Sequence, residues 1–111
     1  MTTIDVPDAV SRYLQVAAEG DLEALLACFA SDAQVIDEGH TYRGHDEIRR
    51  WREAVTSRYT YTVTVLSSEP VDADRHVVTA RLDGNFPGHT ARLRFRFALR
   101  GGLISALEIA P

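Results

Sequence analysis

The sequence has one cysteine, Cys28, and no lysine among its 111 residues. A single cysteine excludes an internal disulfide, and we expect it to be a buried structural residue. No apolar run approaches the roughly 20 residues that a membrane-spanning helix needs. The first residues have neither the basic start nor the apolar stretch of a signal peptide. We therefore expect a soluble cytoplasmic protein that does not bind a membrane.

Charge of one sign does not dominate either. The sequence has twelve arginines and 16 acidic residues, so its net charge is -4. The chain thus lacks the overall positive charge that would attract a phosphate backbone, and we do not expect it to bind nucleic acid. Hydrophobic residues make up 45% of the sequence and charged residues 25%, an ordinary globular balance. A chain of this length fills one core, which predicts a single domain over residues 1–111.

Apolar residues recur at helical spacing in the first half of the sequence. The first predicted helix has Asp5 as its N-cap, Pro7 in its first turn and Gly20 at its end. Asp21 is predicted to cap a second helix. The apolar stripe of that helix consists of Leu22, Leu25, Leu26 and Phe29.

The next segments are shorter and more polar. A turn at residues 31–32 is predicted to precede a short strand over residues 33–37. Residues 38–44 are predicted to form a polar loop, with room for a short strand at residues 41–43. A third helix is predicted over residues 45–57. Its buried residues are expected to be Ile48, Trp51 and Val55.

From Tyr59 onward the apolar period changes to two, which is typical of strands. Strands are predicted over residues 59–65, 75–86, 91–99 and 103–110. In the third of these, alternate residues from Ala91 to Leu99 are apolar, and Arg92, Arg94 and Arg96 lie between them. Short connections imply an antiparallel meander. We therefore predict an α+β fold in which three N-terminal helices cover the apolar face of a mostly antiparallel sheet.

Several segments carry a resemblance to a known family. They are Arg12-Tyr13-Leu14, residues 20–25, residues 29–33, residues 42–48, and the ending from Phe97 to Ile109. Together they resemble the nuclear transport factor 2-like superfamily, and more narrowly the SnoaL-like polyketide cyclases and the ketosteroid isomerases. The resemblance implies a curved sheet that forms a cone-shaped pocket, with a small apolar molecule as ligand and no cofactor.

Tyr13 and Asp37 are the candidate catalytic residues. In ketosteroid isomerases a tyrosine of the first helix donates a hydrogen bond to the substrate oxyanion, and an aspartate at the end of the first strand moves the proton. The resemblance implies these roles for Tyr13 and Asp37. Strand parity places Asp37 on the same face as Val35, which should face the core. The alternatives are a core tyrosine and a solvated acid at a strand end.

The pattern departs from the ketosteroid isomerases at one position. Those enzymes carry a further acid on a later strand, and Phe95 is predicted to stand there. The predicted function is a cofactor-independent isomerase or cyclase that acts on an apolar carbonyl compound. The alternative is a non-catalytic ligand-binding or dimerising module. The predicted substrate-binding residues are Phe29, Val35, Trp51, Leu82, Phe86, Phe95 and Leu107.

Two further groups of residues could carry chemistry, an Arg-x-Asp pair on a strand and a set of histidines. Arg81 and Asp83 resemble the Arg-x-Asp pair of limonene-epoxide hydrolases, which offers epoxide hydrolysis as a third function. The apolar alternation of the same strand, however, points both side chains away from the buried face. His40, His45 and Asp46 lack metal-ligand spacing, so we predict no metal site. His76 and His89 are expected to be exposed.

The three arginines of the 91–99 strand form a row on the face opposite the helices. Glu108 of the last strand is expected to share that face, which gives an ion-pair ladder. Proteins of related fold often pair through this sheet. We therefore expect a homodimer through the outer sheet face.

Overall fold

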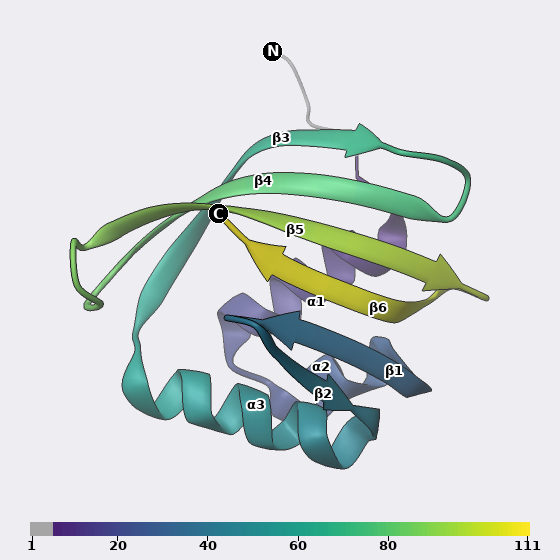
Figure 1. The fold of residues 1–111 in the computed structure, drawn as a ribbon, viewed down its shortest axis with the longest axis horizontal. Coiled ribbons are helices and arrows are strands. Elements are labelled where there is room, and N and C mark those ends of the chain that lie inside the picture. Colours follow the sequence, from purple (N-terminus) through teal and green to yellow (C-terminus); the bar gives the residue numbers. More distant parts are fainter. Residues whose placement is uncertain (1–5) are drawn as a thin grey trace.

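The computed structural model describes residues 6–111 (Figure 1). Two short elements open the chain, α1 (Asp8–Glu19) and α2 (Leu22–Ala27). The remaining elements in chain order are β1 (Phe29–Asp37), β2 (His40–Arg43), α3 (Gly44–Arg58), β3 (Tyr61–Pro70), β4 (Arg75–Gly84), β5 (Thr90–Arg100) and β6 (Leu103–Ala110).

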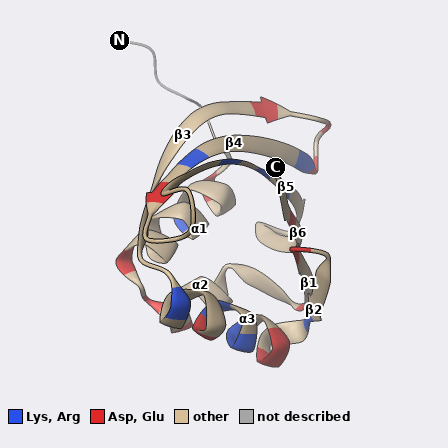
Figure 2. Ribbon diagram, turned by 60° about the vertical axis from the view of Figure 1, so that its left-hand side comes forward, with Lys and Arg blue, Asp and Glu red and all other residues tan. Residues whose placement is uncertain are grey.

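The strands form a six-stranded sheet in the order β2-β1-β6-β5-β4-β3. All neighbours are antiparallel except β1 and β6, which run parallel. Figure 2 shows the strands curving over the helices, so that sheet and helices form opposite walls of the molecule. The predicted α+β architecture, three helices against a curved and mostly antiparallel sheet, is confirmed.

The helix ends follow the capping residues in the sequence. Gly20 ends α1 in the left-handed conformation, with φ of 74°, which a glycine adopts without steric cost. The Asp21 carboxylate accepts a hydrogen bond of 3.1 Å from the Ala24 backbone N–H and caps α2 as predicted. Pro7 stands at the N-cap position of α1, just ahead of the first turn. The predicted cap Asp5 lies outside the described residues.

The first strand is longer than the sequence indicates. Residues 31–32 belong to β1, and Phe29 begins that strand instead of completing the α2 stripe. The cause is a non-local pairing: Phe29 lies opposite Ile104 of β6, and the Ile104 N–H donates a 2.8 Å hydrogen bond to the Cys28 carbonyl. The pairing of β1 with β6 shifts register between Phe29 and Gln34, the stretch that contains the Ser-Asp pair.

A tight turn joins β1 to β2 and holds the end of β1 in place. Asp37 pairs with His40, and the two residues between them both have positive φ, 53° for Glu38 and 78° for Gly39. Two residues of positive φ match the right-handed twist of the flanking strands. The turn therefore fixes Asp37 as the last residue of β1, next to α3.

The helices and the inner sheet face enclose an apolar core. Its largest fully buried side chains are Phe29, Phe97, Leu25, Ile48, Ile104, Leu107, Val10, Val35 and Val78. Cys28 is buried, and its thiol lies 3.4 Å from the Ala24 carbonyl. His76 is also buried and hydrogen-bonds to Ser68, so its predicted exposure is wrong. His76 precedes Val78 by two residues on β4, so its side chain lies on the same buried face of the sheet.

The outer sheet face carries charged side chains in pairs. Arg81 and Asp83 are 3.1 Å apart, and Arg96 and Glu108 are 3.5 Å apart. Each of these side chains is about half exposed, so the pairs contribute little to stability. The shared face predicted for Glu108 and the arginine row is confirmed. Within residues 6–111, no helix has the length and apolar character to cross a membrane.

Candidate functional site

A cavity of about 370 Å³ lies between the helices and the inner face of the sheet. Its walls include residues of α1, α3 and every strand. Aromatic side chains make up much of the lining, and they are Tyr13, Tyr42, Trp51, Tyr59, Tyr61, Phe86 and Phe95. The polar residues are few: Asp37, Glu38, Arg52 and Arg58. An apolar cavity with a few polar groups is the usual form of a small-molecule site.

The sheet register divides the inner face into core and cavity. Phe97, Leu107 and Val35 lie opposite one another on β5, β6 and β1, and all three are in the core.

A second row of residues lies two positions away from the first row on each of these strands. It consists of Phe95, Ile109 and Asp37, and all three line the cavity. A step of two keeps a side chain on the same face. The boundary between core and cavity therefore runs across the strands, between these two rows.

The predicted substrate-binding residues fall on both sides of this boundary. Trp51, Leu82, Phe86 and Phe95 line the cavity. The remaining three, Phe29, Val35 and Leu107, are at most 2% exposed and belong to the core. Alternation gives the face of a side chain but not the depth at which the cavity begins.

Asp37 is placed at the cavity wall by the end of β1. Its Oδ2 accepts a hydrogen bond of 3.0 Å from the indole N–H of Trp51 in α3. Burial raises the pKa of the Asp37 carboxyl, whereas the Trp51 hydrogen bond lowers it in part. The nearby charge of Glu38 adds to the rise. A hydrogen bond with the Glu38 backbone also lowers it in part. A carboxyl with a raised pKa at the wall of a mostly apolar cavity has the properties of a general acid or base.

Tyr13 reaches the same cavity from α1 and is held by two phenylalanines. Its ring packs edge-on against Phe29 and Phe97, with centroid distances of 5.7 Å to each. Its hydroxyl has no hydrogen-bond partner among residues 6–111. Every fully enclosed side-chain polar atom in that range has a hydrogen-bond partner. Because the Tyr13 hydroxyl has none, it is not fully enclosed, and it opens onto the cavity that Tyr13 lines.

The electrostatics of Tyr13 favour its neutral form. Burial raises the pKa of the hydroxyl far above its usual value, and the nearby Arg52 charge offsets only part of this. The hydroxyl therefore keeps its proton at neutral pH. A neutral phenol without a partner is a hydrogen-bond donor available to an oxygen atom of a ligand.

Arg52 is a cavity residue that the sequence reading missed. It is 7% exposed and lies on the inner side of α3. Its guanidinium donates a hydrogen bond of 2.8 Å to the Tyr61 hydroxyl and another of 3.3 Å to the Ala17 carbonyl near the end of α1. Helical spacing does predict its position, because Arg52 follows Ile48 by four residues and adjoins Trp51, so all three lie on the buried side of α3.

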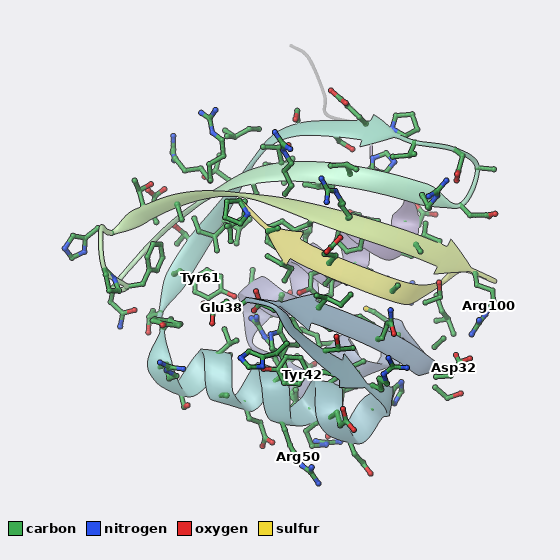
Figure 3. The ribbon with its side chains drawn as sticks, in the orientation of Figure 1. Asp32, Glu38, Tyr42, Arg50, Tyr61 and Arg100 are labelled. Carbon is green, nitrogen blue, oxygen red and sulfur yellow. The ribbon has the colours of Figure 1, made fainter. Side chains whose placement is uncertain are left out.

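Further cavity residues outside the predicted set include Glu38, Tyr42 and Tyr61, all labelled in Figure 3. Glu38 comes from the turn after β1, Tyr42 from β2 and Tyr61 from the start of β3. The β1–β2 hairpin and α3 bring Tyr42 within 6.4 Å of the Trp51 ring, measured between centroids. Strand alternation at residues 59–65 pointed to an apolar face without indicating a cavity.

The remaining candidates lie elsewhere. Arg81 and Asp83 pair with each other on the outer sheet face and do not line the cavity. His40 is exposed, and the His45 ring hydrogen-bonds to the Phe29 carbonyl at 3.0 Å. In the described part of the chain, no group of three or more His, Cys, Asp or Glu side chains is placed to hold a metal ion.

A curved sheet, covering helices and an aromatic cavity between them define the cone-shaped α+β class of pocket proteins. Residues 10–107 match the sequence model of the SnoaL-like domain. The chain therefore belongs to the SnoaL-like family, within the nuclear transport factor 2-like superfamily. No protein of curated function matches the sequence.

Solved structures agree with this assignment. A protein of Sinorhizobium meliloti (SMa1630), provisionally assigned as a polyketide cyclase, is 38% identical with a TM-score of 0.90, and the match covers 96% of each chain. The Δ5-3-ketosteroid isomerase of a Mycobacterium species is 21% identical with a TM-score of 0.78, over 93% of this chain and 89% of that one.

A third structure contains a steroid. The protein RV0760c of Mycobacterium tuberculosis, in complex with estradiol-17β-hemisuccinate, is 19% identical with a TM-score of 0.79. The match covers 93% of this chain and 90% of that one. At this identity the likeness is one of fold.

Proposed function

We propose that the protein is an isomerase or cyclase that acts on an apolar carbonyl compound without a cofactor, with Asp37 as acid and base and Tyr13 as oxyanion donor. One observation carries the proposal: a carboxyl of raised pKa and an unpartnered phenol hydroxyl border the same mostly apolar cavity. The assignments of the ketosteroid isomerase and polyketide cyclase relatives support the same reaction class.

The reaction begins with proton abstraction. The Asp37 carboxylate takes a proton from the carbon next to the substrate carbonyl, and the C–H electron pair becomes the enolate. Negative charge moves to the carbonyl oxygen, where the Tyr13 hydroxyl donates a hydrogen bond to it. Asp37 then returns the proton to another carbon, which completes an isomerisation. In a cyclisation the enolate carbon instead attacks a second carbonyl, and the proton passes to the new alkoxide.

Proton exchange tests this step without knowledge of the natural substrate. Apolar ketones with acidic α-hydrogens are incubated with the protein in D2O, and loss of the α-proton NMR signal is followed. We expect exchange above the buffer rate and its loss, by about 100-fold or more, in Asp37→Asn.

Asp32→Asn is the matched control, because Asp32 lies on the same strand, five residues before Asp37, and pairs with Arg100 (Figure 3). This variant should keep the exchange activity. Equal exchange rates in Asp37→Asn and the unsubstituted protein would remove Asp37 from the proposal.

A binding function without turnover is the second candidate, and Phe95 is the observation that favours it. Phe95 borders the cavity on β5, where the sequence comparison expects the further acid of the ketosteroid isomerases. One oxyanion donor is thus replaced by a hydrocarbon, which weakens enolate stabilisation by a few kcal/mol. Ligand affinity that survives in Asp37→Asn, without any proton exchange in either protein, would favour this function.

We also propose that two copies pair through the outer sheet face and that the single domain acts in the cytoplasm, as the sequence predicts. Arg94 of β5 projects from that face, is exposed and lies opposite Thr79. Analytical ultracentrifugation should show a dimer that dissociates in Arg94→Glu. A monomer at high concentration would rule out the pairing.

A further inference from the structure

Arg52 carries a charge that is buried without a negative partner. Its side chain is 7% exposed, and none of the carboxylates in residues 6–111 forms an ion pair with it. The ion pairs within that range use other arginines, all of them at the surface. A buried charge that lacks an opposite charge is costly, so it is usually paired or functional.

The partners that Arg52 does have are neutral. The Tyr61 hydroxyl and the Ala17 carbonyl each accept one hydrogen bond from it. Ala17 is close to the end of α1, where the helix dipole supplies about half of a negative charge. The guanidinium also lies over the rings of Trp51 and Tyr61, at 6.0 and 5.9 Å from their centroids. These contacts position the guanidinium and compensate its charge only in part.

The hydrogen-bonding capacity of this group is not exhausted. A guanidinium has five N–H donors, and Arg52 makes two hydrogen bonds, to Tyr61 and Ala17. The Tyr61 oxygen accepts from Arg52, which leaves the Tyr61 proton free to be donated elsewhere. Both residues border the cavity. A fork of N–H donors with an adjacent O–H donor matches the two oxygens of a carboxylate.

We propose that the cavity selects apolar molecules that carry a carboxylate, and that Arg52 and Tyr61 bind this group. The inference rests on the proposed function in that the same cavity holds the substrate. Arg52 is then an affinity and specificity residue, while Asp37 and Tyr13 act on another part of the molecule. The cavity of about 370 Å³ has room for an anchored carboxylate and a separate reacting carbonyl.

Trp51 supplies a built-in probe of binding, because it is the one tryptophan of the sequence and lies beside Arg52. Its fluorescence is titrated with two probes of the same apolar body, adamantane-1-carboxylate and adamantane-1-carboxamide. Neither probe absorbs where tryptophan is excited. We expect the carboxylate to bind roughly tenfold or more tightly than the amide at neutral pH.

Substitutions at Arg52 test the source of this preference. Arg52→Met should abolish the preference for the carboxylate, whereas Arg52→Lys should keep part of it because the charge remains. Arg50→Met is the matched control: Arg50 lies two residues away on α3, is exposed, and points away from the cavity (Figure 3). It should leave the preference unchanged. Tyr61→Phe keeps the buried ring, should reduce the preference in part, and provides a test if Arg52→Met fails to fold.

The outcomes separate this inference from the proposed reaction. Asp37→Asn should lose proton exchange and still prefer the carboxylate probe, whereas the control Arg50→Met should keep both. Equal affinity of the unsubstituted protein for both probes would overturn the inference, as would failure of the carboxylate to bind. A preference that survives in Arg52→Met and Tyr61→Phe would overturn it as well.

Discussion

The indole N–H of Trp51 donates a hydrogen bond of 3.0 Å to Oδ2 of Asp37, and this bond joins α3 to the last residue of β1. It has two consequences for the candidate base. The bond fixes the orientation of the carboxyl at the cavity wall. It also stabilises the ionised form and so opposes the rise in pKa that burial causes. Trp51 is thus positioned to tune Asp37.

Trp51→Phe should raise the pKa of Asp37. The substitution removes the hydrogen bond that favours the charged carboxylate, while the ring that shields it from water stays. The pKa is measured by NMR titration of the Asp37 carboxyl carbon. The pH at which proton exchange reaches its plateau should shift upward in parallel, since the base must be ionised.

Tyr42→Phe serves as the control for that experiment. Tyr42 lines the same wall and packs near Trp51, but its hydroxyl makes no hydrogen bond to Asp37. The pKa of Asp37 should stay where it is in this variant. A fall in the pKa after Trp51→Phe would mean that the indole shields the carboxyl more than it stabilises its charge.

Asp37→Asn should stabilise the fold at neutral pH. Burial raises the pKa of Asp37 above its unfolded value of about 3.9, so the ionised carboxylate weakens the native state at pH 7. The favourable contribution of Asp37 is present below the unfolded pKa and is lost as the pH rises through the folded pKa. The gain in Asp37→Asn should be a fraction of a kcal/mol, because the cavity leaves the carboxyl partly solvated.

Urea unfolding at pH 7 and near pH 4 measures this difference, which should shrink on acidification. Asp32→Asn is the control, because the pKa of Asp32 is shifted in the opposite direction. The hydrogen bond and ion pair with Arg100 lower the pKa of Asp32, so this variant should gain no stability at pH 7. Destabilisation of Asp37→Asn at pH 7 would show that the Trp51 bond outweighs the effect of burial.

The sheet was the most predictable part of the fold, and the reason is local. Alternate residues of β5 are apolar on one face and arginines on the other, and short turns fix antiparallel neighbours. The start of β1 was less predictable because its pairing is distant in sequence. The Ser31–Asp32 segment has the composition of a turn, yet the preceding Phe29 pairs with Ile104 of β6 and draws the segment into a strand.

The candidate site divides in a similar way. Parity alone placed Asp37 on the face of Val35, and Asp37 does line the cavity. The depth at which the core ends depends on sheet curvature and helix placement, which a period of two does not contain. Arg52 is harder to predict, because a charged residue of a helix is expected to face solvent. A charged residue at the spacing of the buried residues of a helix is a feature that a single sequence does reveal.

Phe97→Ala should cost about 3–5 kcal/mol of stability, since Phe97 is 1% exposed and its ring packs against Tyr13 and Phe95. Loss of this support should also misplace the Tyr13 hydroxyl and lower proton exchange in the remaining folded protein. Chemical denaturation gives the free energy of unfolding. Arg96→Ala, one residue away on the exposed face, should change it by less than about 0.5 kcal/mol.

Gly84 is the position where backbone packing and the cavity meet. A Cβ added there would lie 2.5 Å from the Thr60 carbonyl oxygen and 2.6 Å from the Tyr61 Cβ. It would also lie 3.0 Å from the Phe86 ring. Gly84→Ala must therefore displace backbone atoms, and we expect a loss of about 1–3 kcal/mol in the free energy of unfolding.

The displaced residues include two that line the cavity, so Gly84→Ala should also weaken probe binding more than a mere loss of stability would. Tyr61 accepts a hydrogen bond from Arg52, and its movement should reduce the carboxylate preference in folded protein. Gly39→Asn is the control, since a Cβ at Gly39 meets nothing within 4 Å and asparagine tolerates the φ of 78° found there. It should lose less than about 1 kcal/mol. Unchanged carboxylate preference in Gly84→Ala, with stability reduced as expected, would show that Tyr61 does not orient Arg52 toward the ligand.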